Sequence, residues 1–138
     1  MTIRPFQAAD ESAVVQLWRD CGLVVPQNDP HKDIARKMAF QPELFLVGVE
    51  ADRVVATVMA GYEGHRGWLN YLAVAPGLRR AGLGRQIVRE AETRLRALGC
   101  PKINLQVRTS NAAVIAFYSK LGYKVDDATS MGKRLEND

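Results

Sequence analysis

The apolar residues recur with two periods along the chain, and these periods predict helices alternating with strands. A spacing of three and four residues predicts amphipathic helices over 10–21, 30–40, 82–98 and 111–121. Runs rich in Val and Leu predict strands over 2–6, 44–50, 54–59, 68–74 and 102–107, and a final short pair over 123–125 and 131–135. The side chains expected to face the core are Val14, Leu17, Trp18, Cys21, Ile34, Met38, Leu83, Ile87, Ala91, Leu95 and Leu98.

The order of these elements predicts the fold class. Residues 68–107 read as strand, helix and strand, a crossover that places the two strands parallel. The remaining strands follow one another as antiparallel hairpins. We therefore predict a single domain over 1–138 with a mixed α/β fold. Its sheet has six to seven mostly antiparallel strands with a central parallel pair, and about four helices lie on both faces.

Residues with polar side chains mark where three helices begin. Asp10 stands before the first helix, and Ser110 or Asn111 stands before the last, which are positions for an N-cap. Asn28-Asp29-Pro30 predicts a cap followed by proline at the first helical position.

Cysteine and histidine usage argues against a metal site. The 138 residues contain two cysteines, Cys21 and Cys100, and two histidines, His31 and His65. None of them stands at metal-ligand spacing, and a chain of this length can bury a core without metal or disulfides. We expect both cysteines to be buried thiols.

The charge and hydropathy of the chain narrow its partners. A net charge of +4 is the only feature that suggests a nucleic-acid-binding module, and no basic run is interleaved with aromatic residues. No apolar run approaches the roughly 20 residues needed to cross a bilayer, and residues 1–6 contain no signal-peptide core. The expected location is the cytoplasm, with no membrane partner.

Residues 76–84 form a glycine-containing turn between the strand 68–74 and the helix that follows. Such a turn aims backbone N–H groups and the positive end of the helix dipole at one point, which favours a pyrophosphate. Gly82 would let phosphates approach the backbone, and Gly84 would let the helix pack closely on the sheet. The alternative is a tight turn whose glycines only satisfy backbone geometry. The P-loop and dinucleotide-fold patterns are both absent.

Two motifs resemble the GNAT acetyltransferase superfamily. Arg79-Arg80-Ala81-Gly82-Leu83-Gly84 resembles the pattern [QR]-x-x-G-x-[GA], and residues 111–123 resemble N-x-x-x-x-x-[FL]-Y-x-x-x-G-[FY]. The resemblance covers nearly the whole chain and is strongest to the YpeA-type bacterial acetyltransferases.

The resemblance implies acetyl transfer from acetyl-CoA to a primary amine, on a small molecule or a peptide or protein N-terminus. It implies direct attack within a ternary complex, and a homodimer is plausible for the superfamily. The pantetheine arm would lie in a wedge where the parallel strands splay apart. The residues implied in acetyl-CoA binding are Leu72, Val74, Arg79, Arg80, Ala81, Gly82, Leu83, Gly84, Arg85, Asn111 and Tyr118.

The resemblance also implies catalytic roles. The N–H of Leu72 would stabilise the oxyanion, and Tyr118 would donate a proton or a hydrogen bond to the departing thiolate. Without the motif, the apolar stretch around Tyr118 favours a packed core residue with a satisfied hydroxyl. Asn111 can contact the cofactor, cap its helix, or both.

The general base is not identified by the motifs. Many members of the superfamily carry a glutamate where this chain has Trp68, and the similar ribosomal-protein alanine acetyltransferases carry one at Gln106. Glu63 and His65 are the candidates that remain, unless they lie in a solvated loop and the amine loses its proton to water. A non-catalytic acyl-CoA-binding or regulatory domain is therefore the alternative function. Acceptor specificity is expected in residues 22–29, 62–67 and 124–130.

Overall fold

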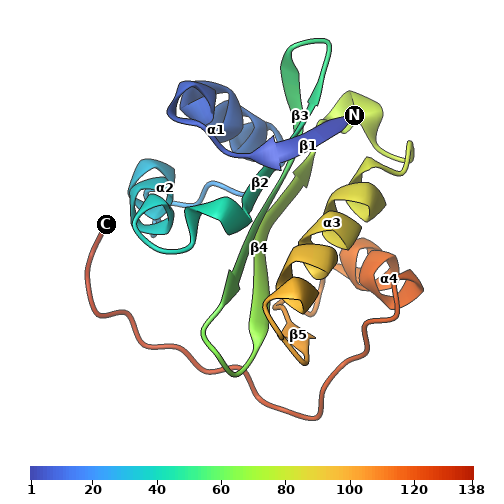
Figure 1. The fold of residues 1–138 in the computed structure, drawn as a ribbon. Helices are drawn as coiled ribbons and strands as arrows, with labels where there is room; N and C mark the ends of the chain where they lie inside the picture. Colours follow the sequence, from blue (N-terminus) through green and yellow to red (C-terminus); the bar gives the residue numbers. More distant parts are fainter. The chain divides into compact units, whose positions relative to one another are not determined.

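The computed structural model describes residues 1–138 and contains one five-stranded sheet with the strand order β1-β2-β3-β4-β5 (Figure 1). The strands are β1 (Thr2–Pro5), β2 (Phe45–Glu50), β3 (Arg53–Tyr62), β4 (Gly67–Val74) and β5 (Ile103–Asn104). The helices are α1 (Glu11–Asp20), α2 (Pro30–Met38), α3 (Leu83–Ala97) and α4 (Ala112–Lys120). Short 3-10 turns lie at Ala8–Asp10, Pro42–Leu44 and Pro76–Leu78.

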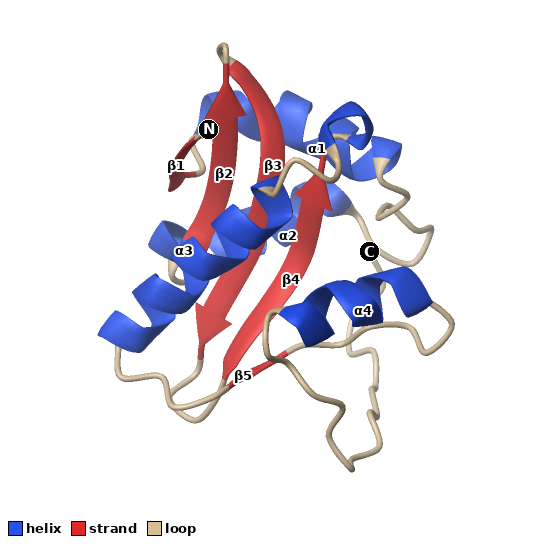
Figure 2. Cartoon of the chain, turned by 90° about the vertical axis from the view of Figure 1, so that its right-hand side faces the viewer, coloured by secondary structure: helices blue, strands red, loops and turns tan.

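The chain divides into two compact units. Unit 1 comprises Met1–Asn104 with Asp138 and contains the sheet, α1, α2 and α3. Unit 2 comprises Leu105–Asn137 and contains α4 between two loop segments. Within unit 1, α1 and α2 cover one face of the sheet and α3 covers the other, as Figures 1 and 2 show.

Both faces of the sheet are packed. On one face, Trp18 of α1 is fully buried, and Phe45 of β2 stacks on Phe6 with ring centroids 4.6 Å apart. On the other face, one stripe of α3 is buried: Leu83, Ile87, Val88, Ala91 and Leu95. Since β2 and β3 lie between these layers, their side chains are buried on both faces, which explains their continuous apolar sequence.

The prediction of a core position is wrong for two side chains, because their helices end earlier than expected. Met38 is the last residue of α2 and is 38% exposed. Leu98 follows α3, where Gly99 takes a φ of +85° and turns the chain away, and it is 50% exposed. The two cysteine thiols are partly exposed rather than buried, and each donates to a backbone carbonyl.

The predicted mixed α/β class with a parallel strand pair is confirmed, with two differences. The sheet has five strands rather than six or seven, because 123–125 and 131–135 form no ladder and leave Val125, Met131 and Leu135 exposed. The parallel pair lies at the edge of the sheet, where β4 pairs with the two residues of β5. Alternating apolar residues predict a strand only where a partner edge is available to pair with it.

Asp10 does not cap α1 through its side chain, contrary to prediction. Its carboxylate instead accepts two hydrogen bonds from the Arg4 guanidinium, at 2.7 and 3.0 Å, and one from the backbone N–H of Gln7. These hydrogen bonds hold the pKa of Asp10 below its usual range, and those from the Arg4 guanidinium have the largest effect. The pair therefore fastens β1 to the start of α1.

Candidate active site

The N-terminus of α3 lacks a side-chain cap. Gly82 is its N-cap residue, with a φ of +80°, and the first turn contains no acidic residue. The side chain of Asp29 caps α2 by accepting from two backbone N–H groups, and that of Asn111 caps α4 by accepting from the N–H of Val114. The α3 N-terminus thus presents backbone N–H groups and a positive dipole end with no carboxylate to neutralise them.

The residues around this helix end leave it open. A Cβ placed on Gly82 would meet no heavy atom within 4 Å. Arg79, Arg80 and Arg85 are exposed, and Arg80 takes the left-handed conformation with a φ of +73°. Leu83 and Gly84 are buried, so the first turn of the helix is anchored while its N-cap residue Gly82 is exposed. The electrostatics of this turn suit a polyanion such as a pyrophosphate.

The edge of β4 has an unpaired stretch. Its parallel pairing with β5 consists of Gly67 opposite Ile103 and Trp68 opposite Asn104. Of the remaining β4 residues, 69, 70, 73 and 74 pair with β3 on one side, and none of 69–74 pairs with a strand on the other. An unpaired strand edge of this kind is the type to which an extended ligand can hydrogen-bond as a further strand.

A β-bulge interrupts β4 within this stretch. Thr57 pairs with Ala73 and Met59 pairs with Asn70, so the two residues Tyr71 and Leu72 stand opposite one residue of β3. Tyr71 has a φ of +51°, which is uncommon and costly for a residue with a side chain. Bulges of this kind re-aim side chains and end regular pairing.

Buried contacts hold the bulge in place. The Oγ1 of Thr57, which is fully buried, donates to the Tyr71 carbonyl at 2.8 Å and accepts from Trp18 Nε1 at 2.9 Å. The Tyr71 ring stacks on Trp18 with centroids 3.8 Å apart, and its hydroxyl donates to Asp33 of α2 at 2.6 Å. Burial, followed by the hydrogen bond to Asp33, raises the pKa of Tyr71, which therefore stays protonated.

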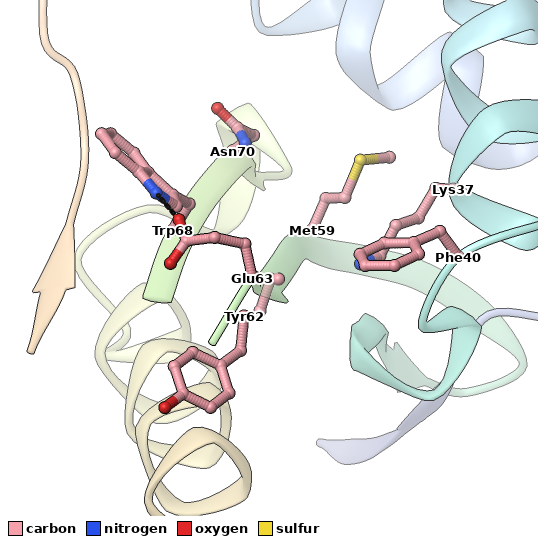
Figure 3. Close-up of a pocket in the computed structure, with 9 residues that line it drawn as sticks. Lys37, Phe40, Met59, Tyr62, Glu63, Trp68 and Asn70 are labelled. Carbon is pink, nitrogen blue, oxygen red and sulfur yellow. Dashed lines mark hydrogen bonds between the residues drawn. The ribbon is translucent and has the colours of Figure 1, made fainter. Parts of the chain in front are cut away.

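A pocket of about 200 Å³ lies beside the bulge, on the face covered by α1 and α2 (Figure 3). Figure 3 shows two of its side chains, Lys37 and Phe40, on one side of Met59, with Trp68 and Glu63 on the other. The full lining is Lys37, Phe40, Met59, Ala60, Gly61, Tyr62, Glu63, Trp68 and Asn70.

The end of β3 that borders the pocket is fixed by a side chain acting as a strand. The Gln41 side-chain amide accepts from the N–H of Tyr62 and donates to its carbonyl, both at 2.8 Å. Gln41 itself takes a left-handed φ of +53° directly before the 3-10 turn. The pocket wall is therefore held rigidly on this side.

Glu63, a candidate general base from the sequence, has its carboxylate occupied. One oxygen accepts from the backbone N–H groups of His65 and Arg66, and the other accepts from Trp68 Nε1 at 3.1 Å. These hydrogen bonds, led by that from Arg66, lower the pKa of Glu63. The carboxylate organises the loop after β3 and is a weaker proton acceptor than an ordinary glutamate. His65 is exposed on the same loop.

In unit 2, Tyr118 lies at the C-terminal end of α4's apolar stretch and is buried. Its ring meets those of Phe117 and Tyr123 edge-on, with centroids 5.0 and 5.3 Å away. Burial raises its pKa, so the hydroxyl keeps its proton and can donate a hydrogen bond. Asn111 is the N-cap of α4, as one of its two predicted roles requires. Gln106 donates to Ser130.

Comparison with known proteins decides the family. The Acetyltransferase (GNAT) family matches residues 12–123, which is most of the chain and includes parts of both units. The chain belongs to the GNAT acetyltransferase family. This confirms the resemblance seen in the two motifs and makes the chain an N-acetyltransferase.

Relatives of this GNAT protein include bacterial acetyltransferases. It is 47% identical over 135 residues to Acetyltransferase YE1169 of Yersinia enterocolitica, covering 98% of this chain and 96% of that protein. It is 26% identical to the ribosomal-protein-S18-alanine N-acetyltransferase of Escherichia coli, with a TM-score of 0.74 over 88% of this chain and 76% of that one. It is 25% identical to Chaetomium thermophilum Naa20, solved with a bisubstrate analogue, with a TM-score of 0.73 over 91% and 72% of the two chains.

Sequence reasoning missed three residues that shape this GNAT site. Thr57 lies inside an apolar strand, and a polar residue in such a run was the available signal that a buried hydrogen bond exists. Lys37 and Gln41 stand at and beyond the end of α2, and nothing in their spacing indicated a pocket.

None of the helices has the length and apolar character needed to cross a membrane.

Proposed function

We propose that this GNAT protein transfers the acetyl group of acetyl-CoA to a primary amine by direct attack within a ternary complex. The observation that carries the proposal is the uncapped N-terminus of α3, whose amides and neighbouring arginines form an open cationic turn. The Naa20 structure was solved with a bisubstrate analogue, which supports a ternary complex by similarity.

The residues present fit acetyl-CoA. The amides around Arg79 to Gly84, with Arg85, would hold the pyrophosphate, since anions bind favourably at a helix N-terminus. The unpaired β4 edge around Leu72 and Val74 would hold the pantetheine arm by backbone hydrogen bonds. We assign no contact to Asn111 beyond its cap.

The acetyl group supplied by acetyl-CoA is attacked by the nitrogen of a neutral amine. As the C–N bond forms, the carbonyl oxygen becomes an oxyanion, for which we propose the N–H of Leu72, next to the bulged Tyr71, as hydrogen-bond donor. The attacking nitrogen, which has become positively charged, releases one N–H proton to solvent; the C–S bond then breaks, and the thiolate leaves with a hydrogen bond donated by Tyr118, so that a neutral amide remains. Tyr118 suits donation better than full proton transfer, because burial raises its pKa.

The proton of the amine requires a separate route. Since the Glu63 carboxylate is occupied and its pKa is lowered, we propose that Glu63 positions the loop after β3 and that the amine loses its proton to solvent. On this proposal the reaction uses amine that is already deprotonated, so it needs no glutamate at the positions of Trp68 and Gln106.

The test is release of free CoA thiol from acetyl-CoA with polyamines, amino acids, aminoglycosides and peptide N-termini, followed by mass spectrometry of the product. We expect thiol release with at least one amine, an added mass of one acetyl group, and intersecting double-reciprocal plots. Parallel plots would contradict the ternary complex. Tight acetyl-CoA binding without turnover across the panel would instead favour a regulatory acyl-CoA-binding domain.

A further inference from the structure

The pocket beside the bulge contains a cation without a partner. Lys37 is half-buried at the end of α2, and its ammonium makes no hydrogen bond or ion pair in the structure. The ammonium lies over the backbone of Gly61, where a Cβ would be 3.6 Å from its Nζ. Burial lowers the pKa of Lys37, and the negative charge of Glu43, which makes no ion pair with it, raises that pKa by a smaller amount. A partly desolvated charge without a partner is stabilised when an anion binds beside it.

The other walls of the pocket are mainly apolar. Phe40, Met59 and Trp68 supply aromatic and thioether surface, and Phe40 is 60% exposed at the rim. Glu63 adds a negative charge on the side away from Lys37, as Figure 3 shows. The pocket therefore presents a positive group, an apolar middle and a negative group in that order.

The pocket is close to the point where we propose acetyl transfer. Asn70 lines it, and Leu72 is two residues further along β4, which even at the full rise of an extended strand is at most about 7 Å and is shortened by the bulge. The bulge places the consecutive residues Asn70 and Tyr71 on the same face, because Asn70 meets the pocket and Tyr71 meets Trp18. A ligand held by Lys37 thus lies beside the strand that would carry the thioester.

From this arrangement, and resting on the proposed function, we infer that the acceptor is a small amine that also carries a carboxylate and an apolar side chain. Lys37 binds the carboxylate, and the aromatic and thioether walls bind the apolar group. A carboxylate fits better than a phosphate, because one ammonium lines the pocket without an arginine fork or a helix N-terminus. The volume is below the roughly 300–1,000 Å³ of drug-sized sites, which limits the acceptor to about one residue.

The test compares each amino acid with its decarboxylated amine: phenylalanine with phenethylamine, and leucine with 3-methylbutylamine. Equilibrium affinity is measured by calorimetry in the presence of CoA, and turnover is measured by thiol release. We expect the wild-type protein to prefer the carboxylate-bearing partner at least about tenfold, the effect of one charge-assisted hydrogen bond. In Lys37→Met the preference falls to less than about twofold, and Lys37→Arg keeps part of it.

Lys32→Met is the matched control, since Lys32 is exposed on the same helix and does not line the pocket. It should keep the wild-type preference. Equal affinity of the wild-type protein for both partners, no binding of either, or an equal loss for both in Lys37→Met would overturn the inference. A Lys37-dependent binding preference without thiol release would support the ligand class inferred for the pocket but refute the proposed transfer, and with it the role of that ligand as acceptor. Thiol release without the Lys37-dependent preference would support the proposed transfer and refute the inferred acceptor class.

Discussion

The hydroxyl of Thr57 on β3 donates to the carbonyl of Tyr71 on β4 at 2.8 Å, at the residue where β4 bulges. The same hydroxyl accepts from Trp18 of α1, so one buried oxygen links a helix to the bulge. Tyr71 keeps a φ of +51° only because the surrounding contacts hold it there. The backbone of Leu72, which we propose as oxyanion donor, follows directly.

Replacing Thr57 with valine should therefore affect both stability and catalysis. Valine keeps the shape but leaves the Tyr71 carbonyl and the Trp18 indole without their buried partner, which costs about 2–3 kcal/mol of unfolding free energy. Acetyl-CoA turnover should fall by at least about tenfold as the bulge loosens. Urea denaturation and thiol-release kinetics measure the two effects.

Thr57→Ser is the control for that substitution. It keeps the hydroxyl and removes one methyl, a loss of about 1 kcal/mol, with turnover close to that of the wild-type protein. If serine and valine lowered turnover equally, the hydrogen bond to Tyr71 would have no part in shaping β4.

Asp10 should make stability depend on pH in a defined direction. Its folded-state pKa is lowered by Arg4, so the stabilisation is present above the unfolded pKa of about 3.9 and is lost as pH falls through the folded pKa. Asp10→Asn should therefore cost about 1–3 kcal/mol at pH 7. Urea denaturation at pH 7, 5 and 3 should show the gap between the two proteins closing with acid, whereas a constant gap would assign the effect to packing.

Tyr118→Phe should slow turnover by about 10- to 100-fold, because the departing thiolate loses its hydrogen-bond donor. Acetyl-CoA affinity should change by less than about threefold, since the ring packing against Phe117 and Tyr123 stays. Steady-state kinetics and calorimetry separate the two quantities. Tyr123→Phe removes the same atom from the adjacent ring and should leave turnover near the wild-type rate; equal slowing in both variants would argue for packing alone.

Hydrophobic periodicity predicted most of this fold because the elements bury a face locally. The stripe of α3 from Leu83 to Leu95 and the hairpin of β2 and β3 both follow from spacing, and the structure confirms them. The prediction of the final strands was wrong, because the segments around Val125 and Leu135 pair with no strand edge and stay exposed. Pairing depends on distant segments, which a local pattern does not contain.

The α3 turn could be anticipated for a different reason. Gly82 and its arginines are contiguous, so their chemistry is readable from the sequence alone. The pocket could not be anticipated, since Lys37 and Asn70 line it from α2 and β4, two elements that lie far apart in the sequence. The occupied carboxylate of Glu63 was also hidden, because its partners are mostly backbone amides.

The most direct test is calorimetric titration of acetyl-CoA into Gly82→Asp and Gly82→Ala. Both side chains occupy the open space at the N-cap and strain the backbone at a φ of +80°, aspartate less than alanine, but only aspartate adds a charge. We predict that aspartate weakens the affinity at least about 100-fold more than alanine does, by charge repulsion at the helix N-terminus. Equal affinities in the two variants, with both folded by circular dichroism, would contradict the assignment of α3 as the pyrophosphate site.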